Sequence, residues 1–211
     1  MDGIPTSPTT SSTASPGRPA GRPGRPAAAT REDVLALAVE RFLDGERVDM
    51  QGIARELGLA RATMHRWFGT REELLGEMLA AIAERRLTLI RSESTGTGAE
   101  GLLDCFDRFN RDLAATKGLG VWVAQEQERA LRILTSSGGL VQPRVVAMIE
   151  AMIEAEIEAG RFVTPILPAT LAYAIVRLAE SFLYNDAMFG LRGDTERLRE
   201  LEAALLGINP T

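Results

Sequence analysis

Apolar residues recur at intervals of three and four along most of the chain, which is the spacing of amphipathic helices rather than of strands. The first such segment lies between Thr30 and Gly45, with apolar positions at Val34, Leu35, Ala38 and Phe42. Thr30 and Asp33 resemble a capping box, and Gly45 is a typical helix stop. We therefore expect the first helix between these two signals.

Two short helices should follow closely. Asp49 can cap a helix that ends at Gly58, and Arg61 opens another that ends at Gly69. The inner sides of both helices carry apolar residues: Ile53, Ala54 and Leu57 on the first, and Met64 and Phe68 on the second. Two short helices joined by a tight turn and braced by neighbours are typical of a helix-turn-helix.

The rest of the chain continues the helical pattern. A Thr-x-x-Glu capping box at Thr70 and Glu73 precedes a longer fourth helix that runs to about Ile90. After a glycine-rich break at residues 96–98, five more helices are expected at about 99–116, 119–135, 143–159, 168–189 and 194–207. No segment alternates convincingly between apolar and polar residues. The expected fold is all-α with about nine helices.

The composition along the chain predicts three parts. Residues 1–29 form an arm rich in Arg, Pro and Gly that we expect to be disordered. Residues 30–75 should form a three-helix domain with the helix-turn-helix, and residues 76–211 a larger helical domain.

Composition also narrows the classes of function. The chain has one cysteine, Cys105, and one histidine, His65, which argues against metal sites and most histidine-dependent catalysis. We found no phosphate-binding loop and no paired catalytic carboxylates. No apolar run reaches the roughly 18 residues of a spanning helix, and the first thirty residues hold no apolar block typical of a secretory signal. We therefore expect a cytoplasmic protein that is not an enzyme, needs no cofactor and does not enter a membrane.

Positive charge is concentrated in two segments, although the formal net charge is -5. Residues 50–71 hold four arginines and one glutamate, and residues 1–29 hold three arginines and one aspartate. In a helix-turn-helix the exposed side of the second helix enters the major groove, where Arg can pair with guanine and His can reach a phosphate or a base edge. The outward residues here are Arg61, Ala62, His65 and Arg66. For two arginines alone, a solvated helical face is the alternative.

A family resemblance is carried by Ile53-Ala54, Gly58-Leu59 and the run from Thr63 to Leu74, TMHRWFGTREEL. These residues resemble the DNA-binding domain of the TetR family of bacterial transcriptional regulators. The resemblance is specific over residues 31–78, and the expected number of helices extends it to the C-terminus. It implies a homodimer that binds a near-palindromic operator in double-stranded DNA, usually as a repressor, with a small molecule in the C-terminal domain releasing the DNA. The residues expected at DNA are Arg61, Ala62, Thr63, His65, Arg66, Trp67 and Arg71.

Four positions depart from the family pattern. His65 stands where a tyrosine is usual, so a phosphate contact would pass through an imidazole. Arg71 replaces the usual lysine and keeps a positive charge at a helix N-terminus. Ala60 forgoes a Ser or Thr cap worth about 0.5–2 kcal/mol. Asp49 replaces a phosphate-contacting threonine, so we do not expect that contact.

Two features near the DNA-binding residues leave alternatives open. Trp67 either contacts the groove or packs to support the helix. The arm holds three Gly-Arg-Pro units, which resemble the core of AT-hook segments whose arginines enter the minor groove, at Arg18, Arg22 and Arg25. A leader without any role in DNA binding is the alternative.

Apolar stripes on the last two expected helices suit a dimer interface, because residues 168–189 are apolar on more than one side and so need two partners. In the family these two helices build a four-helix interface between subunits. The expected dimerisation residues are Leu171, Ile175, Leu178, Phe182, Leu198, Leu201 and Leu205. The core of a monomer is the alternative.

A ligand cavity should combine apolar and aromatic residues with a few polar groups. Candidates from the middle helices are Phe106, Phe109, Asn110, Trp122, Gln125, Glu126, Arg129, Met148, Met152 and Tyr173. Core packing or a solvated face is the alternative for each residue. We prefer the cluster from Trp122 to Arg129, and expect a small, mostly apolar effector with a carbonyl or similar acceptor. The stretch from Trp122 to Pro143 is also similar to family members that regulate lactone or quorum-signal breakdown, which suggests a lactone or acyl compound.

Three functions compete. The first is an operator-specific repressor that responds to a ligand. The second is a constitutive dimeric DNA binder whose C-terminal domain only dimerises. The third is a helical small-molecule carrier or enzyme whose basic segment binds something other than DNA.

Overall fold

The chain folds entirely into helices over the part that the computed structural model describes, residues 29–185 and 194–208. The helix-turn-helix end contains α1 (Arg31–Leu43), α2 (Met50–Glu56) and α3 (Arg61–Phe68). The remaining helices are α4 (Arg71–Glu93), α5 (Gly98–Ala115), α6 (Lys117–Gln125), α7 (Gln127–Thr135), α8 (Val141–Glu158), α9 (Pro168–Glu180), the π-helical turn η1 (Ser181–Asn185) and α11 (Thr195–Leu205). No helix in the described ranges is long and apolar enough to cross a membrane.

Local capping signals set the starts of three N-terminal helices. Thr30 and Asp33 form a capping box at α1, and Thr70 and Glu73 form another at α4, in which each side chain binds the backbone amide of the other residue. The Asp49 carboxylate accepts a hydrogen bond from the Gly52 amide at 2.8 Å. These caps confirm the helix starts expected from the sequence, since capping depends on residues only three positions apart.

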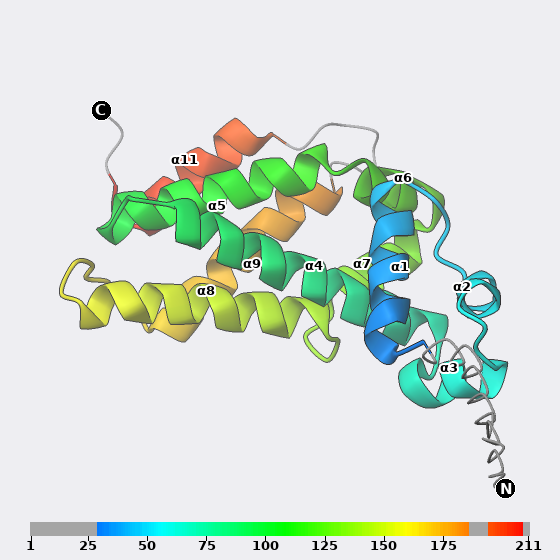
Figure 1. The fold of residues 1–211 in the computed structure, drawn as a ribbon. Coiled ribbons are helices and arrows are strands. Elements are labelled where there is room, and N and C mark those ends of the chain that lie inside the picture. Colours follow the sequence, from blue (N-terminus) through cyan, green and yellow to red (C-terminus); the bar gives the residue numbers. More distant parts are fainter. Residues whose placement is uncertain (1–28, 186–193, 209–211) are drawn as a thin grey trace, which may run out of the picture.

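α4 connects two apolar cores. Figure 1 shows α1, α2 and α3 at one end of the molecule and α4 running from them into a bundle with α5, α8, α9 and α11. The first core joins the helix-turn-helix end with the start of α4 and with α6 and α7. The second core lies between the later part of α4 and the rest of the bundle. A displacement of α4 would therefore disturb both cores.

One expected helix is divided. Residues 119–135 were expected to form a single helix, but α6 ends at Gln125 and α7 begins at Gln127. Glu126, between them, has φ -131° and ψ 47°, which is not a helical conformation. Its carboxylate binds Arg71, which is distant in sequence, so the break depends on a tertiary contact and not on a local stop signal.

α6 packs so closely on the end of α1 that a methyl group would not fit between them. A Cβ on Gly118 would overlap the carbonyl oxygen of Phe42. We expect Gly118→Ala to lower the free energy of unfolding by about 1–3 kcal/mol, as overpacking does when backbone must move. Gly120→Ala on the same helix is the control, because nothing lies within 4 Å of its added Cβ. Thermal unfolding should show a lower midpoint for Gly118→Ala only; equal midpoints for the two variants would contradict the close α1–α6 contact.

Candidate nucleic-acid interface and ligand cavity

α3 presents a polar face to solvent and an apolar face to the core. Met64 and Phe68 are 1% and 2% exposed, so they hold the helix against α1 and α4. On the opposite side lie four exposed residues, Arg61, Ala62, His65 and Arg66. No side chain caps α3, since Ala60 is its N-cap. These four exposed residues are the ones that the sequence predicts to face the major groove of DNA.

His65 and Arg61 are held together on this face. The His65 Nδ1 lies 2.7 Å from the Gly69 carbonyl oxygen, which can only accept, so Nδ1 carries the proton. Nε2 then accepts a hydrogen bond from Arg61 Nε at 3.3 Å. The terminal guanidinium nitrogens of Arg61 remain available to a phosphate or a guanine edge.

The other recognition-helix candidates are less exposed. Thr63 and Trp67 are half-buried, and Trp67 packs against the first core. This placement favours the packing role of Trp67 over a groove contact. Arg18, Arg22 and Arg25 lie outside the described residues.

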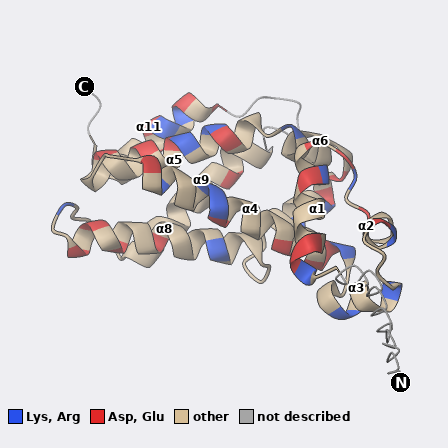
Figure 2. Cartoon of the chain, viewed as in Figure 1, with Lys and Arg blue, Asp and Glu red and all other residues tan. Residues whose placement is uncertain are grey.

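The charge on α3 is entirely positive. The helix contains Arg61 and Arg66 with no acidic residue. Figure 2 shows blue segments on α3 at one end of the molecule, and the red segments of this part lie mainly on α1. A short helix with this charge pattern has the electrostatics that a DNA phosphate backbone favours.

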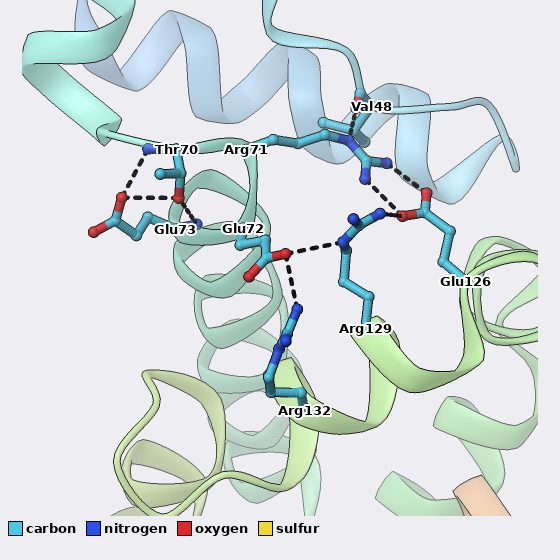
Figure 3. A network of polar contacts seen from close by, with 8 residues as sticks. All are labelled: Val48, Thr70, Arg71, Glu72, Glu73, Glu126, Arg129 and Arg132. Atoms are coloured by element: carbon cyan, nitrogen blue, oxygen red, sulfur yellow. Dashed lines mark hydrogen bonds and ion pairs between the residues drawn. The ribbon is translucent and has the colours of Figure 1, made fainter.

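Arg71 lies at the start of α4 but binds protein groups. Its guanidinium donates two hydrogen bonds to Glu126, both at 2.8 Å, and its Nε donates to the Val48 carbonyl at 2.7 Å (Figure 3). Hydrogen bonds from Arg71, with others from Arg129, lower the pKa of Glu126 to about 2 despite its partial burial. The Arg71 side chain therefore points to Glu126 in this structure, and the phosphate contact expected from the sequence would require this ion pair to open.

The same network continues along α7. Arg129 donates to Glu126 and, at 2.9 Å, to Glu72 on α4, and Arg132 donates to Glu72 at 3.0 Å (Figure 3). These contacts fix the first turn of α4, which follows α3 directly, to the α6–α7 junction. The start of α4 is thus joined to α7 by ion pairs and lies directly after α3 in the chain.

A cavity of about 500 Å³ lies in the middle of the molecule, and most of its lining is apolar. α4, α5, α8 and α9 provide most of the wall. α1 contributes Val39, Phe42 and Leu43, so one helix of the helix-turn-helix end also borders the cavity. The volume is in the range of sites for small organic ligands.

Two amide–carboxylate pairs give the cavity its buried polar groups. The Asn110 side-chain amide donates to Glu202, with N–O distances of 2.9 and 3.2 Å. The Gln142 amide donates to Glu180 at 3.0 and 3.1 Å. Burial raises the pKa of Glu202 to about 7 and raises that of Glu180. Strongly shifted carboxylates in a cavity are typical of functional sites.

The structure divides the expected ligand residues into separate places. Phe106, Phe109 and Asn110 line the cavity. Trp122 does not; it is buried in the first core and packs edge-on against Phe42, with ring centroids 6.0 Å apart. The preferred cluster around Trp122 thus lies apart from the cavity. Other candidates outside the lining are Gln125, Glu126 and Arg129 in an open polar depression, half-buried Met148 and Met152, and exposed Tyr173.

Sequence reasoning missed Gln142, Glu180 and Glu202. Each carboxylate lies on the apolar side of its helix: Glu202 follows Leu198 by four residues, and Glu180 follows Val176 by four. A charged residue four positions after a core residue, inside an otherwise apolar stripe, was the available signal.

The expected dimerisation residues also fall into two groups, one buried in the chain's own core and one directed outward. Leu171, Ile175 and Leu198 are at most 2% exposed and belong to the chain's own core. Leu178 and Phe182 are half-buried, and Leu201 and Leu205 are 41% and 38% exposed. The outward apolar face on α9, η1 and α11 therefore consists of Leu178, Phe182, Leu201 and Leu205.

Among the described residues, no group of three or more His, Cys, Asp and Glu side chains is placed to hold a metal ion.

Comparison with known proteins shows what the chain is similar to. Residues 97–207 match the model of the tetracyclin repressor-like C-terminal domain. The transcriptional repressor QsdR of the TetR family from R. erythropolis is 28% identical, with a TM-score of 0.78 over 86% of this chain and 96% of that chain. A comparison with curated proteins gave no match.

Two further solved structures share the fold at lower identity. The fatty acid degradation regulator FadR from Bacillus halodurans is 20% identical, with a TM-score of 0.56 over 86% of this chain and 100% of that chain. GusR from Salmonella enterica is 18% identical, with a TM-score of 0.51 over 84% of this chain and 95% of that chain. The C-terminal match covers more than half of the 211 residues, and the helix-turn-helix of α2 and α3 lies N-terminal to the matched residues. The chain belongs to the TetR family of transcriptional regulators.

Proposed function

We propose that this protein is a homodimeric repressor that binds operator DNA through α3 and leaves it when a small molecule occupies the central cavity. The family fold implies DNA-binding transcriptional regulation. The observation that carries the proposal is the cavity wall, because α1 and α4 both border it while α1 and the start of α4 also hold α3 in place. A ligand in this cavity touches the supports of the recognition helix.

Ligand binding acts by changing the distance between the two recognition helices of the dimer. Successive major grooves on one side of DNA lie about 34 Å apart, so both helices fit only at that spacing. A ligand that binds better when α4 is displaced shifts the population away from the DNA-binding state. The ion pairs of Arg71 with Glu126, at the α6–α7 junction, and of Glu72 with α7 transmit the displacement, since they join the first turn of α4 to the larger domain.

The test is a titration of the protein–operator complex. DNA selected from a random pool by the full-length protein supplies the operator, and DNA anisotropy follows its release as candidate ligands are added. A coupling of about 1–3 kcal/mol lowers operator affinity about 5- to 150-fold, and the operator must weaken ligand binding by the same factor. A ligand that binds in the cavity without changing the anisotropy would instead support a constitutive DNA binder.

Arg66→Ala tests the DNA contact itself. Arg66 is exposed on α3, and its side chain makes no hydrogen bond or ion pair with another described residue, so its removal should not disturb the fold. We expect operator affinity to fall about 5- to 150-fold, since one good Arg–base contact contributes about 1–3 kcal/mol. Arg144→Ala is the matched control, because that side chain is 45% exposed on α8, away from α3 and from the outward apolar face of α11. Equal affinities of the Arg66→Ala protein and the wild type would exclude this orientation of α3.

A further inference from the structure

Glu202 differs from the other buried carboxylates in having no cation beside it within the described ranges. Glu156 binds Arg91 and Arg161, and Glu180 accepts from Arg177 at 2.7 Å. Glu202 is 0% exposed, and its described hydrogen-bond partner is the neutral amide of Asn110. A buried charge without a counter-ion is costly, so a site of this kind gains most from a ligand that supplies one.

The surroundings of Glu202 increase the negative potential. Burial, with a smaller contribution from the charge of Asp107 on α5, raises the pKa of Glu202 to about 7. Asp107 itself is bound by Arg111 at 2.9 Å, and Arg199 approaches it to 3.8 Å. The other titratable groups deep in the cavity are Glu180 and Tyr184. No lysine or arginine of the described residues is buried in the cavity; Arg85 and Arg86 line it but are exposed or half-buried, and Arg86 binds Asp112.

Donors are scarce at this end of the cavity. The Asn110 amide nitrogen is directed at both oxygens of Glu202, and the Gln142 amide nitrogen is directed at both oxygens of Glu180. Between Glu202 and Asn110 a carboxylate ligand would meet a carboxylate, and a carbonyl ligand would find the Asn110 donor already engaged. A ligand that donates hydrogen bonds and carries positive charge fits both conditions.

The rest of the wall accepts an apolar body. Phe106, Phe109, Ile149, Ile175 and Val176 border the cavity, and all five are at most 6% exposed. Burial of a flexible hydrocarbon chain there is favourable in proportion to the apolar surface removed from water. The cavity therefore combines a long apolar lining with an anionic anchor.

We infer that the effector of the proposed function is a cationic amphiphile, an apolar molecule with an ammonium or similar nitrogen head group that binds between Glu202 and Asn110. This class differs from the lactone or acyl compound suggested by the sequence. The inference rests on the proposed function only in taking the cavity as the effector site; the chemistry of the head group follows from Glu202.

Three octyl compounds that differ only in the head group test the inference: octylammonium, octanol and octanoate. Isothermal titration calorimetry of the full-length protein at pH 7.5 should give one octylammonium per chain, bound at least tenfold tighter than octanol, with octanoate weakest. Octylammonium affinity should also increase from pH 6 to pH 8, because binding then requires less proton release from Glu202. Octanoate binding as tightly as octylammonium would overturn the inference.

Glu202→Gln isolates the anchor. The variant keeps the size of the side chain and an acceptor for Asn110, so the cavity should persist. We expect octylammonium to lose at least tenfold in affinity and octanol to change less than twofold. Glu200→Gln is the matched control, because Glu200 is exposed on the same helix. An unchanged preference for the amine in Glu202→Gln would place the binding elsewhere and overturn the inference.

DNA anisotropy separates this inference from the proposed function. If octylammonium binds through Glu202 but leaves the operator bound, the head-group assignment stands and the ligand-responsive function fails. If a different compound releases the operator while the octyl series shows no preference for the amine, the ligand-responsive function stands and the head-group assignment fails.

Discussion

Replacing Glu202 with glutamine is expected to raise the free energy of unfolding by about 3 kcal/mol at pH 8 and to change it little at pH 4. Burial, with a smaller contribution from Asp107, raises the pKa of Glu202 from 4.5 to about 7 in the folded protein. Each pKa unit corresponds to about 1.4 kcal/mol, and glutamine carries no charge at any pH. At pH 8 the midpoint of thermal unfolding should rise by about 6–12 °C.

The sign follows from proton binding. Between pH 4.5 and about 7 the folded protein keeps a proton on Glu202 that the unfolded chain has lost, so the contribution of this group to stability falls as the pH rises through that window. Below pH 4.5 both states are protonated and the penalty is absent. Glu126 and Glu156 act in the opposite direction, because arginine contacts lower the pKa of each to about 2, and their contribution is lost as the pH falls from 4.5.

Denaturant unfolding from pH 4 to pH 8 measures the difference between wild type and variant. Glu200→Gln is the control for loss of a carboxylate on the same helix, and its exposed side chain should give a difference that is small at every pH. A Glu202→Gln difference that does not grow with pH would show that Glu202 is not a buried, weakly compensated charge.

The helix-turn-helix could be predicted because its signals are local. Thr30, Asp49 and Thr70 each mark a helix start within three residues of their partners. The exposed face of α3 followed in the same way, since Met64 and Phe68 are one turn apart and define the inner side. Patterns of this range can be predicted without knowledge of any tertiary contact.

Contacts between distant residues could not be predicted. The break at Glu126 depends on Arg71, 55 positions earlier, and nothing in residues 119–135 marks it. The same pair engages the Arg71 side chain that the sequence predicts at a phosphate. Trp122 has the large aromatic side chain expected of a ligand-binding residue, but it packs against Phe42 in the first core.

The cavity and the dimer face could be predicted only in part, for a second reason. Helical periodicity shows which residues lie on one side of a helix but not whether that side faces the core, a cavity or another subunit. Leu198 and Leu201 belonged to one expected interface, yet Leu198 is buried in the chain's own core and Leu201 is 41% exposed. Glu202 lies on the buried side, one turn after Leu198, and was not chosen, although it lines the cavity.

Leu201→Glu is expected to convert the proposed dimer into monomers and to lower operator affinity on the order of 100-fold or more. Leu201 lies on the outward apolar face of α11, with Leu205 one turn later and α9 packed alongside. A carboxylate there would be buried without a partner at a two-fold interface, where each substitution occurs twice. A monomer binds only one half-site, and the second half-site contributes about 10²–10⁴ through effective concentration.

Light scattering at several protein concentrations measures the oligomeric state, and DNA anisotropy with the selected operator measures affinity. Thr88→Glu adds the same charge at an exposed position of α4 and should leave both unchanged. Folding of Leu201→Glu can be checked by circular dichroism, because an exposed leucine contributes little to the core of its own chain. A folded Leu201→Glu protein that stays dimeric would move the interface away from α11, whereas a folded monomer with full operator affinity would show that one recognition helix is enough.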